Sequence, residues 1–304
     1  MKSEETIKEH DGESNEVDSE EKDKGEEIEV DEEDLPSGAA AIHEQIREDG
    51  QKELERDGMA LLWSAIAAGL SMGASLMAKG IFQVHLEGVP GGFLLENLGY
   101  TFGFVIVIMA RQQLFTENTV TAVLPIMHKP TAGNFALLLR LWGLVLLGNM
   151  IGTAIAALAF SQMPIFDDAT RQAFTHISEK VMENSPGEMF ANAVISGWII
   201  ATMVWMFPYA ESAKIVVIIL MTWLVALGDL AHIVVGSVEV FYLVFTGAAS
   251  WHEFLWPFAV PTLLGNITGG TLIFALISHA QIRNDMSNDK KQKMSSRKKT
   301  ASKQ

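Results

Sequence analysis

The sequence of 304 residues contains no cysteine and only three tyrosines. Without cysteine the chain has no disulfide framework, no thiolate metal site and no cysteine nucleophile. It also lacks the HExxH motif, and its apolar stretches hold no paired catalytic carboxylates. We therefore do not expect an enzyme, and the sequence predicts neither a metal site nor another cofactor.

Charge is scarce through most of the chain, because the acidity lies at one end. Residues 1–35 hold 17 Asp or Glu and 4 Lys, a net charge of −13 out of −15 for the whole sequence. Residues 1–37 are also free of aromatic residues, and this composition is typical of a disordered tail. Residues 38–58 place Ile42, Ile46 and Leu54 on a polar background, which predicts an amphipathic helix beside a membrane. This helix is either a solvated lead-in to the membrane domain or a gate.

Long apolar runs are what the chain has in abundance, with 49% hydrophobic residues. A bilayer core of about 30 Å takes about 20 helical residues to cross. Six segments are candidates, at residues 59–82, 98–127, 135–160, 189–207, 214–246 and 255–277. The spacing of Phe174, Ile177 and Val181 predicts a further surface helix over residues 167–182. We expect an all-α membrane protein with its transport domain at residues 59–280.

Two of these segments are interrupted in the middle. In the fifth, Gly228, Asp229 and His232 separate residues 215–227 from residues 233–246, and each piece as a helix would be about 20 Å long, too short to span alone. In the second, polar residues intrude at 111–113 and again at 116–118. Backbone broken at membrane depth is tolerated only where it is buried in protein or lines a polar cavity. The interruptions therefore predict such a cavity.

The two halves of the chain resemble each other. The run LLGNMIG at residues 146–152 matches LLGNITG at residues 263–269, an offset of 117 residues. The same offset carries the interruption at residues 114–116 to residues 231–233. A repeat of three spans inserts its second copy upside down, and inverted repeats with broken helices are typical of channels and transporters. We predict six transmembrane helices as two inverted three-helix repeats, with the second and fifth helices broken.

The distribution of Lys and Arg predicts the orientation in the membrane. The loops at residues 83–97 and 247–254 contain neither residue, whereas Arg47, Lys129, Lys214 and the basic tail at residues 281–304 lie on the opposite side. Because basic loops stay inside, both termini are predicted to be cytoplasmic. We interpret the basic tail as an orientation signal and not as a nucleic-acid site.

Several of these motifs resemble the formate/nitrite transporter family. The resemblance rests on Gly103, on LFTE at residues 114–117, on the broken segment around His232 and on PTLLGNITGG at residues 261–270. It covers roughly residues 59–280 and fits a bacterial inner-membrane branch of the family. The resemblance implies an aquaporin-like fold, a homopentamer in the lipid bilayer with one pathway per protomer, and passage of small monovalent anions such as formate, nitrite or hydrosulfide.

The resemblance also implies functional residues. The family's threonine corresponds to Thr116, its central histidine to His232 and its sixth-helix asparagine to Asn266. Its constrictions correspond to positions on the second and fifth segments, namely Tyr100, Phe104, Leu114 and either Leu224 or Val225.

The chain departs from the family pattern at three places. Arg111, Gln112 and Gln113 replace a Gly-Ala-Glu or Gly-Gly-Glu sequence, Gly236 replaces an asparagine, and Lys180 has the wrong spacing for the family's lysine. These departures concern the substrate more than the architecture.

A mechanism follows from the residues themselves. Half-helices that begin near Thr116 and Asp229 would each point about half a positive charge at the midplane. His232, with an ordinary pKa of about 6.5, can lend a proton. We hypothesise that an anion is drawn in, passes apolar constrictions at Phe104 and Leu114, and shares a proton with His232, because the neutral acid crosses hydrocarbon more easily.

Other roles remain open for several of these residues. Thr116 and Asp229 can act as helix caps. Arg111 is more easily explained by an ion pair with Glu117 or Glu239 than by anion binding, and Glu239 can also relay protons because it lies seven residues beyond His232. Two other function classes also remain: a neutral small-solute pore, and a non-transporting membrane sensor or scaffold that uses the acidic tail.

Overall fold

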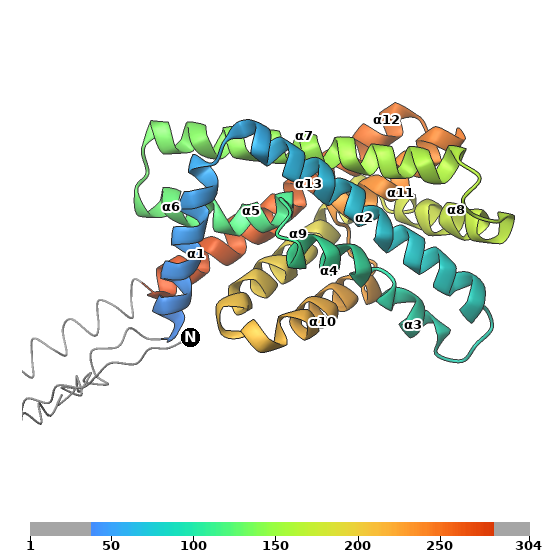
Figure 1. The fold of residues 1–304 in the computed structure, drawn as a ribbon, viewed down its shortest axis with the longest axis horizontal. Helices are drawn as coiled ribbons and strands as arrows, with labels where there is room; N and C mark the ends of the chain where they lie inside the picture. The colour runs from blue at the N-terminus through green and yellow to red at the C-terminus, as the bar shows by residue number, and fades with distance from the viewer. Residues whose placement is uncertain (1–37, 283–304) are drawn as a thin grey trace, which may run out of the picture. The chain divides into compact units, whose positions relative to one another are not determined.

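The computed structural model describes residues 38–282, and all regular structure in this range is helical. The acidic tail predicted over residues 1–37 lies outside the described residues, as do residues 283–304 of the basic tail. The helices are α1 (Gly38–Glu55), α2 (Gly58–Leu86), α3 (Gly92–Leu98), α4 (Thr101–Met109), α5 (Phe115–Thr121), α6 (Val123–His128), α7 (Ala132–Gln162), α8 (Asp168–Met182), α9 (Pro186–Met206), α10 (Lys214–Leu227), α11 (Ile233–Thr246), α12 (Trp251–Glu253) and α13 (Val260–Ile267). π-Helical turns at Phe254–Ala259 and Thr268–Ala275 flank α13 (Figure 1).

Several helices are long and apolar enough to cross a bilayer. Within residues 38–282 five stretches qualify, namely Gly58–Leu86, Gly92–Met109, Ala132–Gln162, Pro186–Tyr209 and Trp251–Ile282. The apolar helix α11 is shorter and follows α10 after a break. The chain is therefore a multi-pass membrane protein, while the count of six spans stays a prediction.

The outer face of these helices is apolar. On α7, for example, Leu139, Leu147 and Ile155 are 54%, 54% and 46% exposed. Apolar side chains exposed in rows along a long helix are suited to contact with lipid tails, because these tails are apolar and spare the side chains exposure to water.

Small residues let the helices approach closely at two corresponding places. A Cβ atom at Gly152 of α7 would lie 2.1 Å from the carbonyl oxygen of Ile66 in α2. A Cβ atom at Gly269 would lie 2.0 Å from the carbonyl oxygen of Val194 in α9. Only glycine permits such backbone contact, which is how membrane helices pack without a hydrophobic driving force. Figure 1 shows α2 and α7 side by side.

Helix starts follow the capping residues in the sequence. Ser185 and Glu188 form a capping box at the start of α9, and Ser250 and Glu253 form one at α12. Each box satisfies backbone N–H groups that have no partner within the helix. The side chain of Asp57 accepts from two N–H groups at the start of α2.

The segments between the spans are more helical than the sequence suggested. The loop expected over residues 83–97 is shortened from both sides, because α2 continues to Leu86 and α3 begins at Gly92. The helix expected over residues 167–182 is present as α8, and it is not only a surface element. Its apolar stripe is buried, with Phe174 fully covered and packed edge-on against the ring of Tyr242 in α11.

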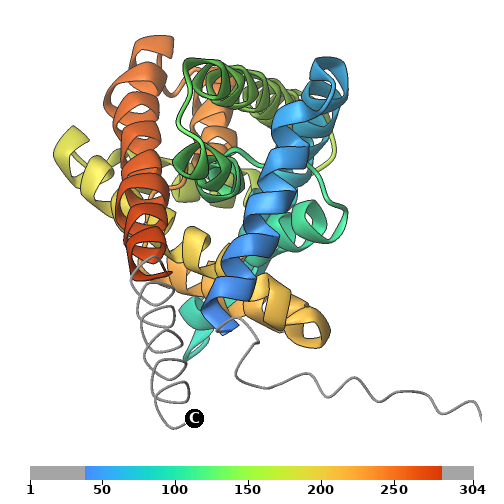
Figure 2. The same cartoon turned by 90° about the vertical axis from the view of Figure 1, so that its left-hand side faces the viewer.

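The two ends of the described chain meet. His43 Nε2 of α1 lies 3.2 Å from Nδ1 of His279, in the helical stretch that follows α13. In Figure 2, α1 is the blue helix and this last stretch is the red one. Helix α1 covers Gly38–Glu55, and its buried residues include Ile46 and Leu54; the amphipathic helix beside the membrane over residues 38–58 stays a prediction.

Candidate functional site

Two breaks with the same backbone course lie between α4 and α5 and between α10 and α11. Each contains one left-handed residue, Arg111 at φ 53° and Asp229 at φ 48°. Each ends on an extended residue directly before the next helix, Leu114 in the first break and His232 in the second. Corresponding positions are 118 residues apart, one more than the offset of 117 between the Gly-Asn segments.

Asn149 of α7 holds the first break in place. Its Oδ1 accepts from the N–H of Phe115, the first residue of α5, at 2.9 Å. Its Nδ2 donates to the carbonyl oxygens of Gln113 and of Ala65 in α2, each at 2.9 Å. Because Asn149 is fully buried, these bonds satisfy backbone groups that water cannot reach.

Asn266 of α13 does the same for the second break. Its Oδ1 accepts from the N–H of Ile233, the first residue of α11, at 2.9 Å. Its Nδ2 donates to the carbonyl oxygens of Ala231 and Ala193, at 3.2 and 2.9 Å, and to Ser196 Oγ at 2.9 Å. The amide of Asn266 is therefore fully engaged by the protein.

His232 joins the two breaks. Its Nδ1 accepts from the N–H groups of Val234 and Val235, each at 3.3 Å, and so caps α11. Its Nε2 lies 2.8 Å from Thr116 Oγ1 in α5. A ring whose Nδ1 accepts carries its hydrogen on Nε2, so we assign Nε2–H as the donor to Thr116. Both side chains are buried.

Aromatic rings continue this site. The ring of Phe104 in α4 meets the ring of His232 edge-on at a centroid distance of 5.1 Å, and Tyr100 packs against Phe104 at 5.4 Å. Phe104 is completely buried. The sequence-predicted residues Tyr100, Phe104, Thr116 and His232 therefore lie together, and the buried Leu114 precedes α5.

A cavity of about 50 Å³ lies on one side of His232. Of the two candidates on the fifth segment, Val225 lines it, while Leu224 does not and is half exposed. Several of the side chains that line the cavity are titratable, namely Lys79, Tyr100, Lys180, Asp229, His232 and Glu239. The cavity is large enough for a solute of a few atoms, since a cavity that holds one water molecule needs about 10 to 15 Å³.

Lys79 is the residue of this cavity that the sequence reading missed. It is the one charged residue in the apolar segment at residues 59–82. A lone ionisable residue in a membrane segment marks a functional site more often than chance. That signal was present in the sequence.

The charged residues of the two breaks are placed differently. Arg111 is exposed, and no ion pair within residues 38–282 includes it, so the predicted pairing with Glu117 or Glu239 is not found. Arg111 has a left-handed backbone conformation at the turn where α4 ends, and its side chain is exposed on the surface there. Asp229 instead binds Lys180 of α8, with Oδ2 to Nζ at 2.7 Å.

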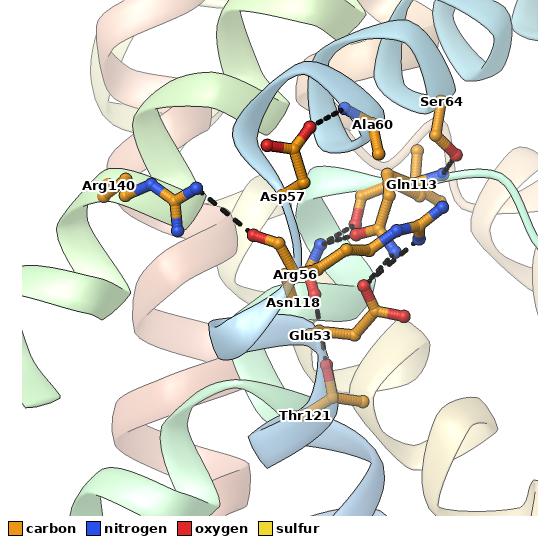
Figure 3. A network of polar contacts seen from close by, with 10 residues as sticks. Glu53, Arg56, Asp57, Ala60, Ser64, Gln113, Asn118, Thr121 and Arg140 are labelled. Carbon is orange, nitrogen blue, oxygen red and sulfur yellow. Dashed lines mark hydrogen bonds and ion pairs between the residues drawn. The ribbon is translucent and has the colours of Figure 1, made fainter.

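A polar network connects the first break to α1 (Figure 3). The side chain of Gln113 donates from Nε2 to Glu53 Oε2 of α1 at 2.8 Å and accepts at Oε1 from Asn118 Nδ2 at 2.9 Å. Its backbone N–H donates to Ser64 Oγ of α2 at 3.1 Å. Arg56 Nη1 also reaches Glu53, at 3.3 Å. Gln113 of the first break is thus an anchor for α1.

The apolar helices define a multi-pass membrane protein in which buried polar side chains join two mid-chain breaks. Residues 40–280 match the family described as Formate/nitrite transporter. The chain therefore belongs to the formate/nitrite transporter family, which consists of channels and transporters rather than enzymes.

Relatives and solved structures agree with this assignment. The chain is 75% identical over 276 residues to "Inner membrane protein YfdC" of Escherichia coli (strain K12), covering 91% of this chain and 89% of that protein. It resembles in fold a "Pentameric formate channel with formate bound", with a TM-score of 0.64 at 22% identity over 74% of this chain and 97% of that one. It also resembles an "FNT family ion channel", with a TM-score of 0.67 at 17% identity over 78% and 97%.

Proposed function

We propose that this protein conducts small monovalent anions of the formate and nitrite kind across a bacterial inner membrane. The observation that carries the proposal is the contact between Thr116 and His232, where the two broken segments meet beside a small cavity with several titratable side chains in its wall. The similar fold of a pentameric channel that binds formate supports it. We further propose a homopentamer with one pathway in each protomer.

The architecture proposed for this pathway is six spans in two inverted three-helix repeats. Support comes from the paired breaks, from the left-handed residue in each, and from Asn149 and Asn266, which make equivalent bonds. In this arrangement α1 and both tails are cytoplasmic, and α8 and the cavity lie toward the periplasm. The domain limits are those predicted from the sequence, with a transport domain at residues 59–280.

The donors available to an anion in this pathway are side chains. The first N–H groups of α11 are satisfied by Asn266 and His232, and that of Phe115 by Asn149. The Thr116 hydroxyl accepts from His232 and keeps its own hydrogen to donate. The half-helices still contribute their dipoles, which favour negative charge at the midplane.

A proton accompanies the anion in this proposal. Between Tyr100, Phe104 and Leu114 a bare anion would lose its hydration without full compensation, whereas the neutral acid pays far less. The sequence singles out His232 as the source of this proton. In the structure Glu239 is a second titratable group that lines the same cavity.

Flux measurements test the proposal. Purified protein in liposomes is offered formate, nitrite, acetate and hydrosulfide at about pH 5.5 and about pH 7.5, on either side of the ordinary imidazole pKa of about 6.5. We expect uptake of the small anions that rises at the lower pH, and slower uptake of the larger acetate. Uptake of water or glycerol with no anion uptake would instead support a neutral-solute pore.

The tail and the third function class are tested in the same liposomes. A variant without residues 1–37 that keeps full, pH-dependent uptake would show that the acidic tail is not a gate. If folded wild-type protein moves none of these solutes, a sensing or scaffolding role replaces the proposal.

A further inference from the structure

The hydrogen bonds of His232 hold its ring in one neutral form. To become a cation the ring would need a hydrogen on Nδ1, the atom that accepts from Val234 and Val235. That hydrogen would face two N–H donors and would remove the side-chain cap of α11, and both effects are unfavourable. The hydrogen on Nε2 already serves Thr116. His232 is thus built to donate a fixed hydrogen bond and is poorly placed to exchange protons.

Glu239 has the opposite surroundings. It lies in α11 seven residues beyond His232, is only 5% exposed, and lines the cavity. Within residues 38–282 no hydrogen bond or ion pair engages its carboxyl group. Gly236, one turn earlier, also lines the cavity, and a Cβ atom there would lie 3.8 Å from Glu239 Oε2. The glycine makes room for the ring of Phe258, which a Cβ atom would meet at 2.8 Å, and a solute in the cavity would reach Glu239 because Glu239 itself lines the wall.

Two further groups complete a binding site around this carboxyl group. The hydroxyl of Tyr100 is buried and has no hydrogen-bond partner in the described part of the chain, although the side chain lines the cavity. Lys79 of α2 lines the same cavity and brings a positive charge to its wall. Buried polar groups without partners are rare and typically await a ligand or water.

The other charged groups of the cavity are already matched. Lys180 of α8 and Asp229 of the break bind each other at 2.7 Å. From α10 the lining residues Val225 and Ala226 are apolar, as is Phe258 from the turn before α13. The titratable groups that face Glu239 are therefore Lys79, Tyr100, the Lys180–Asp229 pair and the neutral His232.

We propose that Glu239 is the group that gives the proton to the permeating anion, with Lys79 as its counter-charge and the Tyr100 hydroxyl as a hydrogen-bond donor to the solute. This rests on the proposed function and replaces His232 as the proton source. In the step, the O–H bond of the protonated Glu239 carboxyl breaks and an O–H bond forms on an oxygen of the anion. The neutral acid leaves past Phe104, the Glu239 carboxylate faces Lys79, and a proton from the water outside restores the acid.

The test compares Glu239→Gln with His232→Asn in formate uptake into liposomes. Asparagine keeps an acceptor at the cap of α11 but cannot titrate. We expect Glu239→Gln to abolish the rise in uptake between about pH 7.5 and about pH 5.5, whereas His232→Asn keeps the ratio between the two rates. Glu239→Asp should restore part of the rise, and Glu87→Gln, at an exposed carboxylate, serves as the control.

Three results would overturn the proposal: a pH ratio that survives in Glu239→Gln, a ratio that is lost in His232→Asn, or wild-type uptake that does not depend on pH. Infrared difference spectra between the two pH values add a readout that needs no transport. They should show a buried carboxylic acid band in the wild type that is absent from Glu239→Gln. No anion uptake by a wild type that shows this band would refute the proposed function, while a missing band with intact uptake would refute only the role of Glu239.

Discussion

The two breaks have the same backbone and different chemistry. Both turn through a left-handed residue and both are held by a buried asparagine. The residue before the following helix is Leu114 in one and His232 in the other, and only His232 caps its helix with a side chain. The two breaks thus share their backbone course and their asparagine anchor, and only the second has a titratable side chain at the residue before its helix.

The surroundings of the breaks differ as well. The first is bonded to α1 through Gln113 and Glu53, while the second borders the cavity that contains Glu239. The following experiments separate what the two breaks share from what distinguishes them.

The largest effect is expected at the paired glycines. Gly152→Leu and Gly269→Leu each place a side chain where backbone atoms of a neighbouring helix lie about 2 Å away, so each should cost about 4 kcal/mol or more or prevent folding. Thermal unfolding in detergent measures this loss. Gly143→Leu, also in α7, is the matched control because nothing lies within 4 Å of its Cβ position. Equal behaviour of the control would show that any bulky residue in these helices is harmful.

The paired asparagines come next. Asn149→Leu and Asn266→Leu each leave buried backbone groups without a partner, at about 1 to 3 kcal/mol for such a group. We expect similar losses of about 3 kcal/mol in the two variants, because the bonds are equivalent. Asn192→Leu loses one hydrogen bond to Asn184, and this loss should cost only about 0.5 kcal/mol. A large inequality between Asn149 and Asn266 would mean that the breaks do not bear the same structural role.

The residues before the helices should behave unequally. His232→Leu makes the second break like the first and removes both the cap and the bond to Thr116, for a loss of about 1 to 2 kcal/mol. His232→Asn should recover the capping part of that loss. Unfolding temperatures of the two variants give the comparison. A stability of His232→Leu equal to that of the wild type would show that the cap contributes nothing.

The bond from the first break to α1 has a smaller expected effect. Gln113→Glu places a carboxylate beside Glu53 and should weaken the docking of α1 by about 1 kcal/mol. The double variant Gln113→Glu with Glu53→Gln exchanges the two groups and should restore the contact. Hydrogen exchange of residues 38–55 reports the docking. Protection that stays reduced in the double variant would argue against this pairing.

The smallest effects are expected at the left-handed residues. Arg111→Gly relieves an unfavourable backbone conformation and should raise stability by about 1 kcal/mol. Asp229→Gly should change it by less than about 0.5 kcal/mol, because aspartate tolerates this conformation better and the lost ion pair with Lys180 is about half exposed. Chemical unfolding series resolve differences of this size. A destabilised Arg111→Gly would show that the arginine makes a favourable contact.

Much of this arrangement could be predicted from the residues. Interrupted apolar runs indicated both breaks, and the Gly-Asn segments indicated two equivalent asparagines. The register was one residue off, because 34 residues separate Phe115 from Asn149 but 33 separate Ile233 from Asn266. An alignment of the two halves on their Gly-Asn segments does not show that the chain between break and asparagine is one residue longer in the first half.

Other parts depend on geometry that no pattern reveals. The sequence gives no backbone angle for Arg111, so its exposed position and missing ion pair could not be anticipated. The cap formed by His232 depends on where its Nδ1 points, which a sequence pattern does not reveal. Because Nδ1 points at the start of α11, we interpret the ring as a fixed hydrogen-bond donor and not as a proton source. Lys79 and Glu239 line one cavity only because α2 and α11 pack together.

The bond between His232 and Thr116 has a mechanical consequence. It is the one polar side-chain contact that joins α5 directly to α11 within residues 38–282, so it ties the first half of the described chain to the second at their centre. A cycle in which the halves swing apart would break this tie and leave the Thr116 hydroxyl and Nε2 of His232 without their partner in a buried place. A passage that stays narrow while solutes move through it keeps the tie intact, so the bond favours a stationary channel over a moving carrier.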